Sequence, residues 1–75
     1  MFFYIRCINE IFETKRVYEL KKALRCMFND VSHRIAEPLA IIDEKGNSVY
    51  NRKELIQIYS DECKKGVQSW LFEKN

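Results

Sequence analysis

The sequence is poor in the residues that metal centres, disulfide frameworks and nucleotide-binding loops require. It contains one histidine, one proline, two glycines and three cysteines, and no two cysteines lie in a C-x-x-C pair. An odd number of widely spaced cysteines with a single histidine predicts neither a zinc site nor a disulfide framework. We therefore expect small apolar thiols in a reduced, cytoplasmic protein, with no metal and no cofactor. Two glycines cannot form a phosphate-cradling loop, so no ATP site is expected.

Long hydrophobic runs are also absent. The opening residues 1–5 are apolar, but Arg6, Asn9, Glu10 and Glu13 follow within two helical turns. This stretch is too short and too polar for a signal peptide or a membrane span. No internal repeat or low-complexity linker interrupts the chain, so residues 1–75 are predicted to form a single domain without a membrane partner.

The composition is that of a small folded domain. Hydrophobic residues make up 47% and charged residues 32% of the 75-residue chain, which is typical of a globular protein. A core of this size confers little stability by itself, so we expect a homo-oligomer, with a homodimer as the simplest case. The net charge of +2 is too small to identify a partner. Five cations nevertheless gather in residues 15–25, and the four on the polar side of the predicted first helix suit phosphate contacts, which leaves nucleic-acid binding open as a second alternative: Lys15, Lys21, Lys22 and Arg25.

The spacing of apolar residues favours an all-α fold. From Val17 onward they recur at steps of three and four, which predicts a first amphipathic helix over residues 14–45, kinked at Pro38. Residues 46–51 are expected to form a loop, and Asn51 with Glu54 has the spacing of a capping box that opens a second helix over residues 52–73. Residues 1–13 form an N-terminal apolar segment whose periodicity fits a strand or a helix. Two such antiparallel helical hairpins would bury their stripes in a four-helix bundle. The first stripe consists of Val17, Leu20, Leu24, Met27, Phe28, Val31, Ile35, Leu39 and Ile42.

A second architecture competes with the bundle. Residues 39–50 also fit two short strands joined by a turn that contains Gly46. With residues 2–8 as a third strand, the chain would form a β-α-β-β-α domain, a three-stranded sheet covered by two helices. The sequence leaves this α+β alternative open.

One stretch of about twelve residues resembles a known family. It runs from Phe28 to Leu39 and includes Ser32-His33, an aliphatic residue two positions after the histidine, and Pro38-Leu39 five and six positions after it. This pattern is similar to the phosphoacceptor-histidine box of sensor histidine kinases, in their dimerisation and histidine-phosphotransfer domain. A weaker similarity extends over residues 17–73.

The resemblance implies a homodimeric four-helix bundle in which His33 accepts a phosphoryl group and passes it to an aspartate of a response-regulator domain. The expected partner contacts are the residues around it: Ser32, Arg34, Glu37 and Pro38. The chain departs from the family in three respects. Arg34 stands where an acid is usual, Glu37 replaces a small polar residue, and there is no ATP-binding domain.

Three functions follow from these patterns. The first is a signal-transduction module that either transfers phosphate through His33 or binds a kinase or response regulator as a non-catalytic mimic. The alternative is a small protein-interaction module, an inhibitor or adaptor, without catalysis. The second alternative is nucleic-acid binding through the basic face. Catalysis, if present, is limited to phosphoryl acceptance and transfer by His33.

Overall fold

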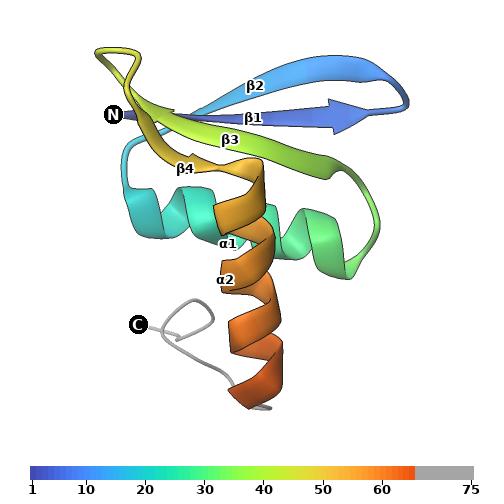
Figure 1. Cartoon of the computed structure of the whole chain (residues 1–75). Coiled ribbons are helices and arrows are strands. Elements are labelled where there is room, and N and C mark those ends of the chain that lie inside the picture. The colour runs from blue at the N-terminus through green and yellow to red at the C-terminus, as the bar shows by residue number, and fades with distance from the viewer. Residues whose placement is uncertain (66–75) are drawn as a thin grey trace.

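The computed structural model describes residues 1–65 and has an α+β architecture (Figure 1). A four-stranded antiparallel sheet has the strand order β2-β1-β3-β4. Both helices lie on the same side of this sheet, and α2 projects away from it (Figure 1). The elements are β1 (Phe2–Ile8), β2 (Ile11–Val17), α1 (Leu20–Ser32), β3 (Glu37–Asp43), β4 (Ser48–Asn51) and α2 (Arg52–Lys65).

The predicted all-α hairpin, and with it the four-helix bundle, is wrong. The stripe from Val17 to Ile42 is divided among β2, α1, the connection after α1 and β3, and Pro38 is the second residue of a strand rather than a helix kink. The predicted helical stripe does not include Ile41, although the structure buries this residue fully. The β-branched run Ile41-Ile42 suits a strand better than a helix. The alternative β-α-β-β-α arrangement is closer to the structure, but it lacks β2.

Strand β2 follows β1 through a two-residue turn. Asn9 and Glu10 both have positive φ, 49° and 69°, as a type I′ hairpin requires. The register of the hairpin runs without a shift from Ile8 opposite Ile11 to Phe2 opposite Val17. Strand β1 is thereby enclosed, with β2 on one side and β3 on the other.

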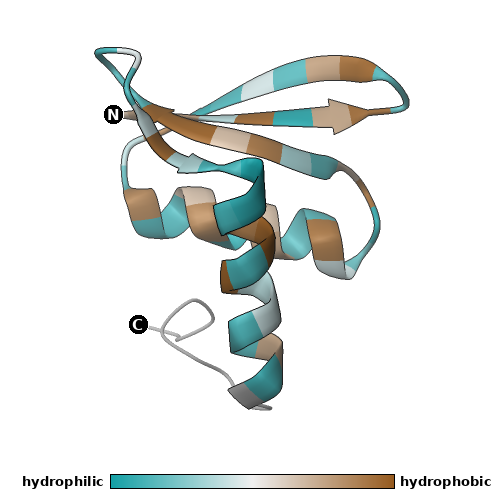
Figure 2. Ribbon diagram, viewed as in Figure 1, coloured by the Kyte–Doolittle hydropathy of each residue, from teal (hydrophilic) through white to brown (hydrophobic). Residues whose placement is uncertain are grey.

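The core lies between the sheet and the two helices. Its fully buried large side chains are Tyr4 of β1, Met27 of α1, Ile41 of β3 and Leu55 of α2. The rings of Phe28 and Tyr59, with centroids 4.5 Å apart, join α1 to α2. In Figure 2 the hydrophobic residues of α1 lie toward the sheet and its polar residues away from it.

Side chains alternate between the two faces of each strand. Since Tyr4 points toward α1, its neighbours Phe3 and Ile5 point to the opposite face, together with their cross-strand partners Ile42 and Ala40. None of the elements within residues 1–65 covers that face (Figure 1).

The predicted capping box at the start of α2 is confirmed. The backbone N–H of Asn51 donates to Oε1 of Glu54, and the N–H of Glu54 donates to Oδ1 of Asn51, each at 2.8 Å. These bonds satisfy donors that the first helical turn leaves open. The predicted extension of this helix to residue 73 lies outside the described residues.

Helix α1 ends in a Schellman motif. The N–H of Ile35 donates to the carbonyl of Asp30 at 2.8 Å, and the N–H of Arg34 donates to that of Val31 at 3.2 Å. Arg34 has a φ of 54°, the left-handed conformation that this motif needs and that glycine usually supplies. The motif turns the chain from α1 into β3.

The turn between β3 and β4 is organised by Asp43. Its Oδ1 accepts the backbone N–H groups of Lys45 at 2.9 Å and Asn47 at 2.8 Å, and Gly46 supplies a positive φ of 88°. The hydrogen bond from Asn47 is the largest of the influences that lower the pKa of the Asp43 carboxyl.

Among residues 1–65, neither helix combines the length and hydrophobicity needed to cross a membrane.

We expect Glu10→Gly to stabilise the protein. A side chain in the left-handed conformation costs about 1–2 kcal/mol, and glycine avoids this cost while losing about 0.5–1 kcal/mol through its greater freedom in the unfolded chain. The expected gain in the free energy of unfolding is about 0.5–1 kcal/mol, measured by urea denaturation. Glu44→Gly is the matched control because Glu44 does not have positive φ. It should lower stability instead, and an equal gain from both variants would contradict the argument.

We expect the β3–β4 turn to weaken at acid pH through Asp43. Because folding lowers the pKa of this carboxyl, its stabilising effect is present above the ordinary carboxyl pKa of about 4 and is lost as the pH falls through the lower folded value. The amide resonances of Lys45 and Asn47, followed by NMR between about pH 6 and 2, should titrate together in that range. Asp43→Asn should abolish this titration and Glu44→Gln should not. A titration that survives Asp43→Asn would show that another group controls the turn.

Candidate functional site

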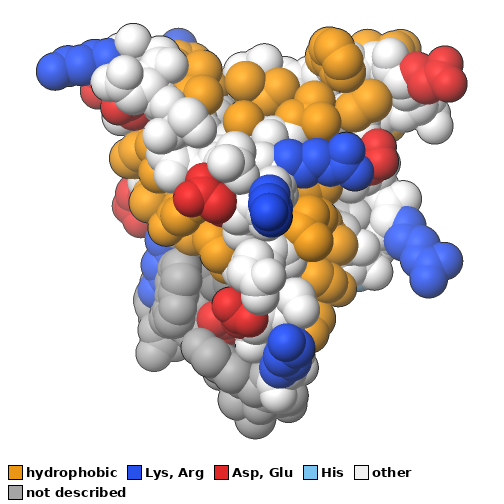
Figure 3. Space-filling model, viewed as in Figure 1, with side chains coloured by type: hydrophobic (Ala, Val, Ile, Leu, Met, Phe, Trp, Pro, Cys, Tyr) orange, Lys and Arg blue, Asp and Glu red, His pale blue; other side chains and the backbone are white. Residues whose placement is uncertain are grey.

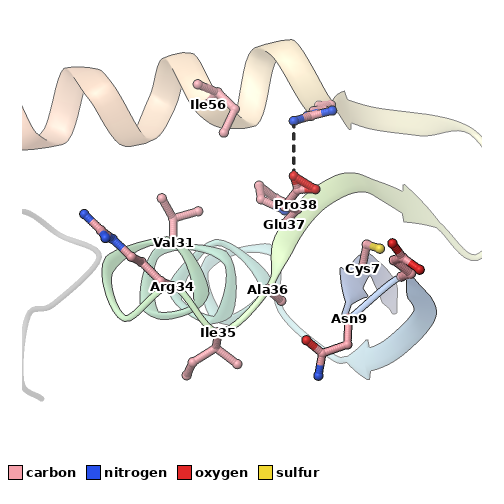
Figure 4. A pocket seen from close by; sticks show the side chains of 11 residues that line it. Cys7, Asn9, Val31, Arg34, Ile35, Ala36, Glu37, Pro38 and Ile56 are labelled. Carbon is pink, nitrogen blue, oxygen red and sulfur yellow. Dashed lines mark ion pairs between the residues drawn. The ribbon is translucent and has the colours of Figure 1, made fainter.

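A hollow of about 500 Å³ opens where α1 ends (Figure 4). The connection from α1 to β3, the first turns of α2 and the β1–β2 turn contribute residues to it. Its volume lies in the range of binding pockets for small molecules. We take this hollow as the candidate site because it joins exposed apolar side chains with charged ones.

Apolar side chains form much of the hollow. Val31 of α1 and Ile56 of α2 both point into the space between the two helices, beside Pro38 of β3 (Figure 4). Ile56 is 41% exposed and Ile35 47% exposed. Each side chain would gain about 25 cal/mol for every Å² that a partner removes from water.

The charged groups of the hollow are two arginines and two carboxylates. Nη2 of Arg52 lies 3.6 Å from Oε2 of Glu37, and both side chains are exposed, so this pair contributes little to stability. Arg34 occupies the left-handed position at the end of α1, which fixes its backbone beside the apolar residues. Glu10 reaches the hollow from the β1–β2 turn.

The residues predicted to contact a partner around His33 do not all lie at the same place in the structure. Arg34, Glu37 and Pro38 all line the hollow, whereas Ser32 lies with its hydroxyl 3.4 Å from that of Tyr59. His33 is the C-cap of α1 and is exposed, with Nδ1 3.1 Å from the backbone oxygen of Asn29. A protonated Nδ1 can donate to that oxygen, which leaves Nε2 as the acceptor.

The fold gives His33 a different setting from the one that the resemblance implies. The helix ends at this residue instead of continuing through it, so the expectation of a histidine on an unbroken helix of a bundle is wrong. A phosphoacceptor role for His33 stays a prediction.

The predicted basic face is spread over two elements. Lys15 of β2 and Arg25 of α1 line a second hollow of about 530 Å³, together with Arg6 and Asp30. Lys21 and Lys22 lie in the first turn of α1. On the face of the molecule seen in Figure 3, the lysine and arginine side chains are dispersed among apolar and acidic ones. Nucleic-acid binding stays a prediction without a specific observation in its favour.

A polar cluster centred on a buried carboxylate joins α1 to the sheet. Asp30 is 2% exposed, and its carboxylate accepts the hydroxyl of Tyr4 at 2.8 Å and Nη1 of Arg6 at 3.0 and 2.9 Å. Arg6 also donates through Nε and Nη2 to Oε1 of Glu13, at 3.0 and 2.6 Å. The cluster thus connects β2, β1 and α1 in series.

Two members of this cluster, Tyr4 and Arg6, have fixed ionisation states. Burial, followed by the hydrogen bond to Asp30, raises the pKa of the Tyr4 hydroxyl well above its usual range. Hydrogen bonds to Asp30 and Glu13 raise the pKa of the Arg6 guanidinium above its ordinary value, which is already high. Tyr4 is therefore neutral and Arg6 charged across the accessible pH range, which suits a structural role better than proton transfer.

Sequence reasoning missed this cluster, although one signal was present. Asp30 is the only acidic residue within α1, and it lies three positions after Met27 on the side of the helix that faces the sheet. Its partners on β1 could not be identified without the register of the strands.

No set of three or more histidine, cysteine, aspartate or glutamate side chains within residues 1–65 is placed to hold a metal ion. Cys7, Cys26 and Cys63 are free thiols. A scan against protein-family models, a search of curated proteins and a search of solved structures found no match to this chain.

We expect Asp30→Ala to be strongly destabilising. It leaves the buried Tyr4 hydroxyl without its acceptor and Arg6 with Glu13 as its remaining carboxylate, and each buried polar group that loses its partner costs about 1–3 kcal/mol. Asp30→Asn retains an acceptor for Tyr4 and should cost less, so it serves as the measurable variant if Asp30→Ala does not fold. The readout is the free energy of unfolding in urea. Asp61→Ala, an exposed aspartate of α2, is the control and should stay within about 0.5 kcal/mol of the parent. Equal effects at the two positions would contradict a structural role for the cluster.

Proposed function

We propose that this chain is a small protein-interaction module, of the inhibitor or adaptor kind and without catalysis, that binds an apolar segment of a partner protein in the hollow at the end of α1. The observation that carries the proposal is the exposure of Ile35 and Ile56 around a hollow with two arginines. Contiguous exposed apolar surface rimmed by polar residues marks interaction sites on soluble proteins.

The apolar surface defines one part of the partner. Val31, Pro38 and Ile56 come from three different elements and border a common space. A leucine or phenylalanine side chain of the partner fits a space of about 500 Å³ and would contact all three. Burial of such an anchor supplies most of the affinity in interfaces of this kind.

The arginines define the other part. Within residues 1–65 no carboxylate lies at ion-pair distance from Arg34, and Arg52 has only the long, exposed contact with Glu37. The hollow also holds Glu10 and Glu37, but Glu37 already faces Arg52, so a partner carboxylate beside the apolar anchor would meet Arg34 as the cation without a carboxylate partner. Planar guanidinium groups bind carboxylates through paired hydrogen bonds, so the preferred segment combines an apolar anchor with acidic neighbours.

We do not propose phosphotransfer through His33. In-line transfer needs donor and acceptor to reach the imidazole, and the resemblance of residues 28–39 implies a histidine on a continuous helix of a four-helix bundle. Here the chain bends at His33 and continues into β3.

The test uses two short probes of defined chemistry. The peptides Asp-Leu-Phe-Asp and Lys-Leu-Phe-Lys, each acetylated and amidated, are titrated into the isotopically labelled 75-residue chain while amide resonances are followed by NMR. We expect saturable shifts at residues 34–37 and at Ile56, with the acidic peptide binding several-fold more tightly. Ile56→Gln should weaken this binding about tenfold, because it removes about 1–2 kcal/mol of apolar burial.

Tyr18→Ser provides the matched control. Tyr18 is 72% exposed and does not line the hollow, so its substitution should leave the titration unchanged. Arg34→Glu combined with Arg52→Glu should reverse the preference between the two peptides. Shifts centred on other residues, or equal affinities for both peptides in the parent chain, would overturn the proposal.

A further inference from the structure

The outer edge of β2 is the longest open strand edge in the described part of the chain. β2 stands at one end of the sheet, and six of its seven residues are exposed, with only Val17 buried. It contains no proline, and its pairing with β1 has no bulge. Proteins commonly protect such edges because unpaired backbone groups recruit another strand.

The hairpin determines which backbone groups of β2 face outward. In a two-residue turn the carbonyl of the first flanking residue bonds the N–H of the second, here Ile8 and Ile11. Hydrogen-bonded and non-bonded positions then alternate along an antiparallel pair. The backbone groups of Phe12, Thr14 and Arg16 therefore point away from β1, where no described strand meets them.

We propose that β2 pairs in antiparallel fashion with β2 of a second copy of this chain, about a two-fold axis at Thr14. The three outward-facing residues of each copy then form about six interchain hydrogen bonds. The two sheets join edge to edge into one continuous sheet. A two-fold contact of this kind uses the same surface on both copies and closes without further growth.

Charge complementarity selects this register. With Thr14 opposite itself, Glu13 lies opposite Lys15 of the second copy, and Phe12 lies opposite Arg16 of the second copy. Opposite charges, and an arginine against an aromatic ring, both stabilise directly facing positions. An axis at Glu13 or at Lys15 would place two like charges opposite each other, which is destabilising.

The same register also places the apolar residues at the end of β2 opposite suitable partners. Ile11 is 67% exposed in the single chain. In the dimer it lies opposite Val17 of the second copy, an apolar residue. Phe12 is 76% exposed and gains a partner as well. The pairing thus accounts for two of the most exposed large apolar side chains in the described structure.

The existing contacts of Glu13 leave room for the new one. Both donors of Arg6 reach its Oε1, so Oε2 is available for Lys15 of the second copy. None of the residues that line the hollow belongs to β2. The inference is therefore independent of the proposed function.

The experiment measures the association of the full chain directly. Sedimentation equilibrium from about 10 μM to 1 mM should show a monomer–dimer equilibrium. Hydrogen exchange at the higher concentration should protect the amides of Phe12, Thr14 and Arg16 and leave them unprotected on dilution. Thr14→Pro removes an outward N–H that an edge strand can lose without unfolding, and should raise the dissociation constant at least about tenfold. Thr14→Val keeps the N–H and should dimerise as the parent does.

Charge reversal tests the register. Lys15→Glu and Glu13→Lys should each be monomeric, because each places like charges opposite. An equal mixture of the two variants restores both opposite-charge pairs and should form a heterodimer. Lys22→Glu and Glu10→Lys are matched controls outside the pairing and should dimerise normally. A parent chain that is monomeric up to 1 mM, or a dimer that persists in Thr14→Pro and in both single reversals, would overturn the inference.

Discussion

The rest of the structure depends on the hydrogen bonds that the carboxylate of Asp30 accepts. It binds Tyr4 and Arg6 of β1, and Arg6 continues to Glu13 of β2, so one buried acid positions α1 on two adjacent strands. The cluster also restricts the register of β1, because a shift by one residue would turn both partners to the other face of the sheet and leave a buried charge alone. The backbone carbonyl of the same residue accepts the N–H of Ile35 that ends α1. Asp30 therefore both orients α1 on the sheet and accepts the hydrogen bond at which α1 ends.

The candidate site is a consequence of where α1 ends. Had the helix continued along its apolar stripe, residues 34–38 would have covered Val31 with another helical turn. The left-handed Arg34 instead turns the chain toward β3, which leaves Val31, Pro38 and Ile56 around an open space. The capping box at Asn51 starts α2 directly after β4 and brings Ile56 to the other side of that space. Two local helix signals thus create a surface between elements that are distant in sequence.

Contacts between residues close in the sequence could be predicted from it, whereas contacts between distant residues could not. The capping box was predictable because both of its partners lie within one helical turn. The long helix was predicted wrongly because Val31, Ile35, Leu39 and Ile42 have helical spacing although only the first lies in α1. Strand β2 was missed because six of its seven residues are exposed, so it has no buried face to produce alternation. Arg34, Glu37 and Pro38 were selected through their proximity to His33, and the structure brings them to the hollow for a different reason, the turn that follows the helix.

The central place of β1 has a consequence for synthesis of the protein. One of its edges is closed by β2, which follows after two residues, whereas the other is closed by β3, whose pairing extends to Asp43 opposite Phe2. A ribosome releases the first hairpin well before the residues of β3, and for that interval a strand carrying Phe2, Phe3, Tyr4 and Ile5 has one bare edge. Transiently exposed apolar edges are where nascent chains aggregate. Docking of β3 therefore ends the interval in which β1 can pair with another chain, because it closes the second edge of that strand.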